Sequence, residues 1–182
     1  MSPSPEGPAL PSGGNPVDEG DAPALRLLEA GDVARVVALE EAIFPEDPWT
    51  EGMISEELQV RGRHYVGVEI GHSLVGYAGI TLGSDADVMT VGVLPGARGR
   101  GIGRLLVEDL LAAARRAGAR RVFLALRASN HVASGLYTRL GFARIGRIRR
   151  YFRHPSEDAV TMRADLAIDP TTDPNPAHDA RS

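Results

Sequence analysis

Glycine and arginine residues gather between Gly96 and Arg104, where a valine-rich segment predicted to be a strand leads into an amphipathic segment predicted to be a helix. The backbone N–H groups at the start of a helix point outward with the helix dipole behind them, so they suit a phosphate group. Glycines let a ligand come close to the backbone, and arginines add positive charge. Taken by itself, an ordinary strand-to-helix loop explains this turn equally well.

Two common phosphate-binding loops are excluded by spacing and composition. Gly99-x-Gly101-x-Gly103 lacks the third-glycine spacing of the dinucleotide fingerprint, and a Walker A loop needs a lysine. All 20 residues counted as Lys or Arg are arginines, and cysteine is absent. The chain therefore has no Schiff-base lysine, no lysine base, no thiol nucleophile and no disulfide or zinc-finger framework.

The remaining candidates for metal or hydrolytic chemistry are weak. The five histidines have no metal-ligand spacing, so we expect them on the surface or in turns and expect no metal. A Gly-x-Ser-x-Gly nucleophile elbow is absent from the sequence. A hydrolase or a metalloenzyme is therefore not favoured.

Most of the negative charge lies at the two ends of the chain. The formal net charge is −4, but residues 25–168 carry 19 arginines against 17 acidic residues, a balance of +2. Six of the 13 prolines fall in residues 3–23 and three in 169–176. We predict that 1–23 and 169–182 are disordered tails around one domain at 24–168. Without an apolar leader or an apolar run of spanning length, we expect a cytoplasmic protein with no membrane contact.

Hydrophobic periodicity within the domain predicts the order β-α-α-β-β-β-α-β-α-β-β. The predicted strands are 24–28, 64–70, 73–82, 87–93, 121–127, 143–152 and 158–167, and the predicted helices are 32–43, 50–61, 101–118 and 130–140. Asp32, Thr50 and Asn130 stand where helix caps are expected. This is a mixed α/β (α+β) pattern, a central twisted sheet of about six to seven strands with about four helices on its two faces.

Two sequence signatures resemble those of the GNAT family of N-acetyltransferases. Arg-x-x-Gly-x-Gly at 98–103, after the Val-x-Val segment, resembles that family's acyl-CoA pyrophosphate loop. Arg-Ala-Ser-Asn at 127–130 and Leu-Tyr-x-x-Leu-Gly-Phe at 136–142 are similar to its second signature. Further residues resemble the ribosomal-protein alanine N-acetyltransferase branch, at 48–51, 149–152 and 157–162. The resemblance covers about residues 24–167 and implies the GNAT fold.

The resemblance implies acetyl-CoA as cosubstrate, with no metal, and direct transfer to a free amine in a ternary complex. It assigns Val91, Gly92 and Val93 to the pantetheine arm, Arg98, Gly99, Arg100, Gly101, Ile102, Gly103 and Arg104 to the pyrophosphate, and Asn130 to a further cofactor contact. It also implies that a backbone amide near Val93 polarises the acetyl carbonyl. Tyr137 would protonate the departing thiolate, since a phenol of pKa about 10 can donate to a thiolate of pKa about 8.5. A tyrosine that only packs under the sheet is the alternative.

The sequence departs from the branch at its general base. The usual glutamate, two positions before the arginine of Arg-Ala-Ser-Asn, is replaced by Ala125. One explanation is that Asp87 acts as the base, because its position resembles that of the glutamate in histone-acetylating relatives. Strand alternation would place Asp87 on one face with Met89, Val91 and Val93. A solvated carboxylate at the start of a strand is an equally good interpretation.

A second explanation is that the acceptor needs little help from a base. An α-amine of pKa about 7.8 is about 14% neutral at pH 7, whereas a lysine amine of pKa about 10.4 is about 0.04% neutral. The difference corresponds to about 3.5 kcal/mol. The predicted acceptor is therefore a protein or peptide N-terminus, with that of a ribosomal protein as the candidate that the resemblance suggests. A small-molecule acetyltransferase and a non-catalytic acyl-CoA sensor remain the alternatives.

Other side chains point to the acceptor side less specifically. An arginine-rich segment ends the domain, at Arg144, Arg147, Arg149, Arg150 and Arg153. A domain charge of only +2 argues against nucleic-acid binding, so a place beside the peptide groove and a solvated face both remain open. Trp49 is expected to anchor packing rather than to touch substrate. We expect a monomer or a weak homodimer.

Overall fold

The computed structural model describes residues 22–167, and the order of helices and strands that it shows confirms the predicted order. The tails predicted at 1–23 and 169–182 lie almost entirely outside the described residues. The strands are β1 (Ala24–Leu27), β2 (Arg63–Ile70), β3 (Ser73–Thr81), β4 (Asp85–Val93), β5 (Arg121–Arg127), β6 (Ala143–Arg153) and β7 (Ser156–Asp165). The helices are α1 (Val33–Ile43), α2 (Glu51–Gln59), α3 (Ile102–Arg116) and α4 (His131–Arg139), with short 3-10 turns at Ala30–Asp32 and Pro95–Ala97.

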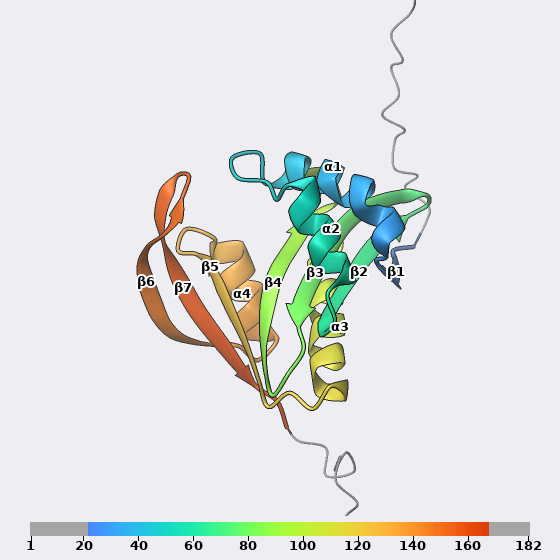
Figure 1. The fold of residues 1–182 in the computed structure, drawn as a ribbon. Coiled ribbons are helices and arrows are strands. Elements are labelled where there is room, and N and C mark those ends of the chain that lie inside the picture. Colours follow the sequence, from blue (N-terminus) through green and yellow to red (C-terminus); the bar gives the residue numbers. More distant parts are fainter. Residues whose placement is uncertain (1–21, 168–182) are drawn as a thin grey trace, which may run out of the picture.

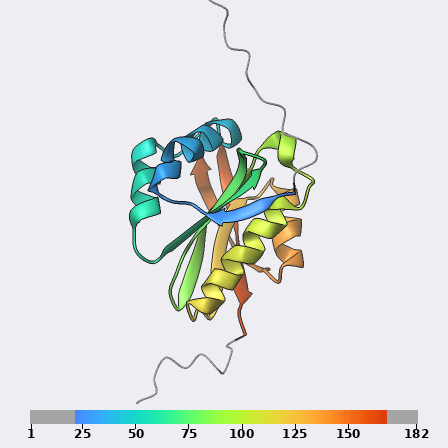
Figure 2. The ribbon, with the colours of Figure 1, turned by 90° about the vertical axis from the view of Figure 1, so that its right-hand side faces the viewer.

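The seven strands form one sheet in the order β1-β2-β3-β4-β5-β7-β6. All neighbours are antiparallel except β4 and β5, which are parallel. Helices α1 and α2 cover one face, and α3 and α4 cover the other (Figures 1 and 2). Two apolar clusters result, a larger one beneath α3 and a smaller one beneath α1 and α2. The mixed sheet with helices on both faces confirms the predicted fold class.

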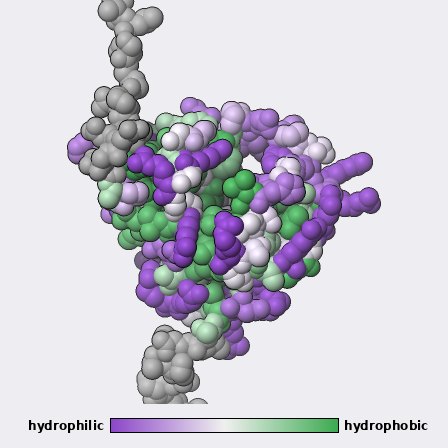
Figure 3. Space-filling model, turned by 180° about the vertical axis from the view of Figure 1, so that it is seen from behind, coloured by the Kyte–Doolittle hydropathy of each residue, from purple (hydrophilic) through white to green (hydrophobic). Residues whose placement is uncertain are grey.

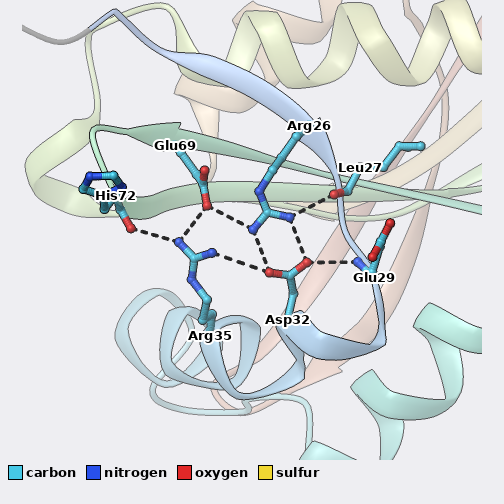
Figure 4. A network of polar contacts seen from close by, with 7 residues as sticks. All are labelled: Arg26, Leu27, Glu29, Asp32, Arg35, Glu69 and His72. Atoms are coloured by element: carbon cyan, nitrogen blue, oxygen red, sulfur yellow. Dashed lines mark hydrogen bonds and ion pairs between the residues drawn. The ribbon is translucent and has the colours of Figure 1, made fainter.

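A polar network fastens α1 to the β1 edge of the sheet (Figure 4). Arg26 donates to both carboxylate oxygens of Asp32, at 2.8 and 2.6 Å, and to Glu69 at 3.0 Å. Arg35, in the first turn of α1, pairs with Glu69 at 2.7 Å. Asp32 was expected to cap α1, but its side chain accepts from the Glu29 N–H at 3.0 Å and so caps the preceding 3-10 turn. These bonds hold the pKa of Asp32 at about 2, chiefly through Arg26.

The sheet splits between its two parallel strands. β4 and β5 pair only through Asp85, Ala86 and Asp87, opposite Arg121, Val122 and Phe123. Beyond these residues the two strands separate, and Figure 1 shows them diverging toward the end of the sheet that α1 covers. Past Asp87, one edge of β4 therefore lacks a neighbouring strand.

A bulge in β4 makes one prediction wrong. Thr90 pairs with Gly79 and Val88 pairs with Ile80, so Met89 is an extra residue that breaks the alternation. Val88, Val91 and Val93 consequently pack against the core beneath α3, while Asp87 faces the α1–α2 side together with Thr81. Asp87 and the two valines therefore do not share a face.

Candidate active site

The glycine-rich turn has the backbone shape of an anion-binding loop. Gly99 and Gly101 have φ angles of 76° and 78°, a left-handed conformation that glycine adopts without strain. No heavy atom would lie within 4 Å of a Cβ at either position, so the turn is open toward its surroundings. The first N–H groups of α3 follow directly and have no partner in their own helix. The loop thus presents free backbone donors at a helix N-terminus.

Two of the three arginines in and after the loop bond to other groups of the protein, and the third is exposed to solvent. Arg98 folds back, and its Nε donates to the Val93 carbonyl at 3.1 Å, so it stabilises the loop. Arg104 pairs with Glu108 one turn along α3, at 2.7 Å. Arg100 is exposed. On the α3 and α4 side of the molecule, apolar side chains lie among a surround of hydrophilic ones (Figure 3). Contact of these arginines with a pyrophosphate stays a prediction.

The backbone of β4 offers donors to the gap between β4 and β5. Leu94 donates its N–H to the Val75 carbonyl at 2.9 Å. In an antiparallel ladder the next pair, Gly76 with Val93, is then a non-hydrogen-bonded pair. The amide of Val93 therefore points away from β3 and toward the unpaired edge of β4. This orientation supports the predicted role of a Val93 amide at the acetyl carbonyl.

Gly92 lies on the opposite side of β4 from the two valines. A Cβ at this position would come within 3.1 Å of Ile43 and 3.2 Å of Phe44, both at the end of α1. Gly92 thus allows α1 to approach the split strand closely. This packing gives Gly92 a structural reason that the resemblance did not supply.

Tyr137 lies in α4 on the same side of the sheet as the glycine-rich turn. The residue is 7% exposed and its ring meets Phe142 edge to face, with centroids 5.5 Å apart. Burial raises the pKa of Tyr137 to about 12. The phenol therefore keeps its proton through the physiological range, as a donor must. Complete transfer to a thiolate of pKa about 8.5 would be uphill by about 4.8 kcal/mol unless the thiolate is also desolvated.

Asn130 has a local task in addition to its predicted one. Its Oδ1 accepts from the Ala133 N–H at 3.1 Å, so it caps α4 as the sequence predicts. The amide nitrogen is left for another partner, and contact with the cofactor stays a prediction. Gly103 lies where α3 and α4 meet, 3.4 Å from Leu136 as measured from an added Cβ.

A hollow of about 750 Å³ opens on the opposite face of the split, beside α1 and α2. Its lining residues come from the α1–α2 connection and from β3 to β7, and they are Trp49, Thr81, Asp87, Val88, Met89, Phe123, Leu124, Ala125, Ile145, Tyr151, Phe152, Thr161 and Met162. The volume suits a small ligand or the end of a peptide. The hollow is mainly apolar and aromatic, and Asp87 is its one ionisable carboxylate. We refer to it below as the acceptor hollow.

Asp87 and Ala125 line the acceptor hollow together. Asp87 is opposite Phe123 in the parallel pair, and Ala125 follows Phe123 by two residues, so all three lie on one face. The Asp87 N–H donates to Thr81 Oγ1 at 2.8 Å. The carboxylate is exposed and stands one strand away from the position that carries glutamate in the branch. Its use as a base stays a prediction that this placement supports.

The arginine of the Arg-Ala-Ser-Asn signature supports the hairpin that walls the acceptor hollow. Arg127 donates to the carbonyls of His154 and Pro155, at 2.8 and 3.1 Å, and its guanidinium lies 4.4 Å from the Phe152 ring centroid. Glu157 accepts from the Ser129 N–H at 2.6 Å, which with Arg127 lowers the pKa of Glu157. Sequence reasoning missed these supporting roles because the partners lie about 30 residues apart.

Trp49 lines the acceptor hollow, whereas the β6 arginines are not among its lining residues. Arg147 pairs with Asp158 at 2.7 Å, whereas Arg144, Arg149, Arg150 and Arg153 are exposed and form no ion pair within residues 22–167. Trp49 packs against the smaller apolar cluster and also lines the hollow, so its position is compatible both with anchoring the packing and with touching substrate. Among the described residues, no group of three or more His, Asp or Glu is arranged to hold a metal, and no helix is suited to span a membrane.

This split sheet, with a glycine-rich turn on one face and a hollow on the other, is the architecture expected of an acetyltransferase that uses acetyl-CoA. The acetyltransferase (GNAT) family model matches residues 33–142, and the chain belongs to that family. It is 44% identical over 147 residues to the N-alpha-acetyltransferase RimI of Mycobacterium tuberculosis, a match that covers 78% of this chain and 91% of that protein. It is 32% identical over 141 residues to the putative [ribosomal protein bS18]-alanine N-acetyltransferase of Bacillus subtilis, covering 76% and 93% of the two chains.

A solved structure has the same architecture. The ribosomal-protein-S18-alanine N-acetyltransferase from Escherichia coli superposes with a TM-score of 0.74 at 24% identity, covering 80% of this chain and 95% of the other. At this identity the likeness concerns the fold. The predicted family and its acetyltransferase activity are thus confirmed, while the roles of individual site residues remain to be tested.

Proposed function

We propose that the protein transfers the acetyl group of acetyl-CoA to the N-terminal α-amine of a protein, with a ribosomal protein as the first candidate acceptor. The observation that carries this proposal is the split between β4 and β5, which has the glycine-rich turn on one face and the acceptor hollow on the other. A donor and an amine can approach the split from opposite sides and react without a covalent enzyme intermediate. The names of the Mycobacterium and Bacillus relatives support this choice of acceptor. Ribosomal proteins are made in the cytoplasm, and we place the reaction there.

In this mechanism the turn orients the cosubstrate and β4 activates it. The free N–H groups of Gly101 to Arg104 bind the pyrophosphate, and the unpaired edge of β4 binds the pantetheine arm. The Val93 amide donates to the acetyl carbonyl as negative charge develops on its oxygen. Tyr137 donates its proton toward the sulfur as the C–S bond breaks. The chain's own groups thus act at the carbonyl and at the leaving group.

The acceptor amine must lose a proton before or during attack. Asp87 is the carboxylate of the acceptor hollow and takes this proton directly or through a water molecule. Because about 14% of an α-amine is already neutral at pH 7, Asp87 has only a modest task with such an acceptor. A lysine acceptor would depend on the base far more strongly.

A second candidate acceptor is a small amine. The acceptor hollow has the size and aromatic lining of a small-molecule site. The chain is also 32% identical over 108 residues to the streptothricin acetyltransferase of Streptomyces lavendulae, over 57% of each protein. Mass spectrometry distinguishes the two candidate acceptors. The protein is incubated with acetyl-CoA and either a ribosomal protein with its native N-terminus or a panel of amino-sugars and polyamines, and the acetylated product is identified. Cofactor binding with transfer to none of them would indicate an acyl-CoA sensor.

A further inference from the structure

Glu40 is a carboxylate in the interior, near the end of α1. Its residue is 2% exposed, and it forms no ion pair within residues 22–167. One oxygen accepts a hydrogen bond from the Tyr77 hydroxyl, and the other accepts from the Trp49 backbone N–H at 2.8 Å. Both oxygens of the carboxyl group are thus engaged by groups of the protein, one from β3 and one from the α1–α2 connection.

Burying a carboxylate without a cation is unfavourable, and an apolar residue of similar size would avoid the cost. A buried carboxyl group of this kind therefore points to a role for the backbone and side-chain groups that it binds. Trp49 lies at the end of the connection between α1 and α2 and lines the acceptor hollow. Among the described residues, the one other hydrogen bond formed by residues 45–49 of that connection joins the Asp47 N–H to the Phe44 carbonyl, at 3.1 Å.

The other donor ties the same carboxylate to the split in the sheet. Tyr77 lies in the middle of β3, and its hydroxyl accepts from Thr90 Oγ1 at 3.4 Å. Thr90 directly follows the bulge residue Met89, where β4 leaves β5. Glu40 thus joins one wall of the acceptor hollow to the strand that bears the reaction centre.

We propose that Glu40 is a positioning residue for the acceptor, which holds Trp49 in the wall of the acceptor hollow through the Trp49 backbone. Acceptor binding then depends on Glu40, whereas acetyl-CoA binding on the opposite face does not. This inference rests on the proposed function, because it takes the hollow to be the acceptor side.

The test compares Glu40→Gln with Glu41→Gln, the same substitution one residue along α1 at an exposed position. Trp49 is the only tryptophan of the chain, so its fluorescence reports on this wall alone. For Glu40→Gln we expect the acceptor KM to rise about tenfold, as for the loss of one hydrogen bond. The Kd for acetyl-CoA stays unchanged, the Trp49 emission shifts to longer wavelength, and acrylamide quenches it more. Glu41→Gln behaves as the unsubstituted protein.

An unchanged acceptor KM with unchanged Trp49 emission overturns the proposal, as does a parallel loss of acetyl-CoA affinity. If Glu40→Gln does not fold, the double variant Glu40→Met/Tyr77→Phe removes the buried carboxyl group together with its phenolic partner. We expect the same shift of Trp49 emission in that variant, and native-like emission overturns the proposal. If the unsubstituted protein acetylates no acceptor, the proposed function fails, and the emission of the variants still decides whether Glu40 positions Trp49.

Discussion

Replacing Tyr137 by phenylalanine separates catalysis from packing at the proposed acid. The ring is buried and meets Phe142 edge to face, and a phenylalanine ring can keep this contact. Burial is the cause of its raised pKa, with no hydrogen bond from the described residues contributing, so little folding energy is lost with the hydroxyl. We expect the free energy of unfolding to change by less than about 1 kcal/mol.

The effect on turnover follows from the same environment. Loss of a positioned general acid typically lowers kcat by about 10² to 10⁴, or about 3 to 5 kcal/mol of transition-state stabilisation. The Kd for acetyl-CoA stays unchanged, because Tyr137 acts on sulfur only as the bond breaks. Because its pKa is about 12, the activity of the unsubstituted protein shows no loss from Tyr137 ionisation below about pH 11. Stopped-flow transfer, calorimetric titration with acetyl-CoA and thermal unfolding measure the three quantities. An unchanged kcat, or a loss of cofactor affinity in its place, refutes the assignment.

Three further predictions concern the base, the loop and the fold. Asp87→Asn lowers kcat with an α-amine acceptor less than about tenfold at pH 7, and the deficit vanishes by pH 9, where the amine is almost wholly neutral; an unchanged pH–rate profile leaves the low pKa of the amine as the sufficient explanation. Gly101→Ala, at φ 78°, costs about 1 kcal/mol in urea unfolding and raises the Kd for acetyl-CoA; a Kd equal to that of the unsubstituted protein would remove the turn from the binding site. The pKa of Asp32 falls from 3.8 to about 2 beside Arg26, so the ionised carboxylate contributes about 2 kcal/mol of stability that is present above pH 4 and lost as the pH falls toward 2. In urea unfolding, Asp32→Asn should lose less stability over this pH range than the unsubstituted protein does. An equal loss of stability in the two proteins would contradict the role of the pair.

Sequence patterns predicted the elements that depend on local signals. β5 begins and ends where alternation predicts, and the caps at Thr50 and Asn130 both accept the expected backbone N–H. The bulge at Met89 was not predictable, because an inserted residue leaves an apolar strand apolar. As a result, the prediction from strand alternation placed Asp87 on the same face of β4 as Val91 and Val93, which is wrong.

Features that depend on distant partners also escaped prediction. The sequence pattern gives no sign that Glu40 differs from other residues of an amphipathic helix, because its buried partner Tyr77 is 37 residues away. Asp32 met the expectation for a cap by type and position, but Arg26 and the Glu29 N–H compete successfully for its carboxylate. The acceptor hollow gathers residues from six segments, and only the folded sheet brings Asp87 beside Ala125.

The most direct test of the account is to locate the acetyl group that the protein transfers. A ribosomal protein with a free N-terminus and internal lysines is incubated with acetyl-CoA and the protein, and the product is fragmented in the mass spectrometer. The account predicts one acetyl group on the N-terminal residue, formed at a rate that depends on Tyr137. Transfer confined to lysine side chains or to small amines, or no transfer to any of these acceptors, would contradict it.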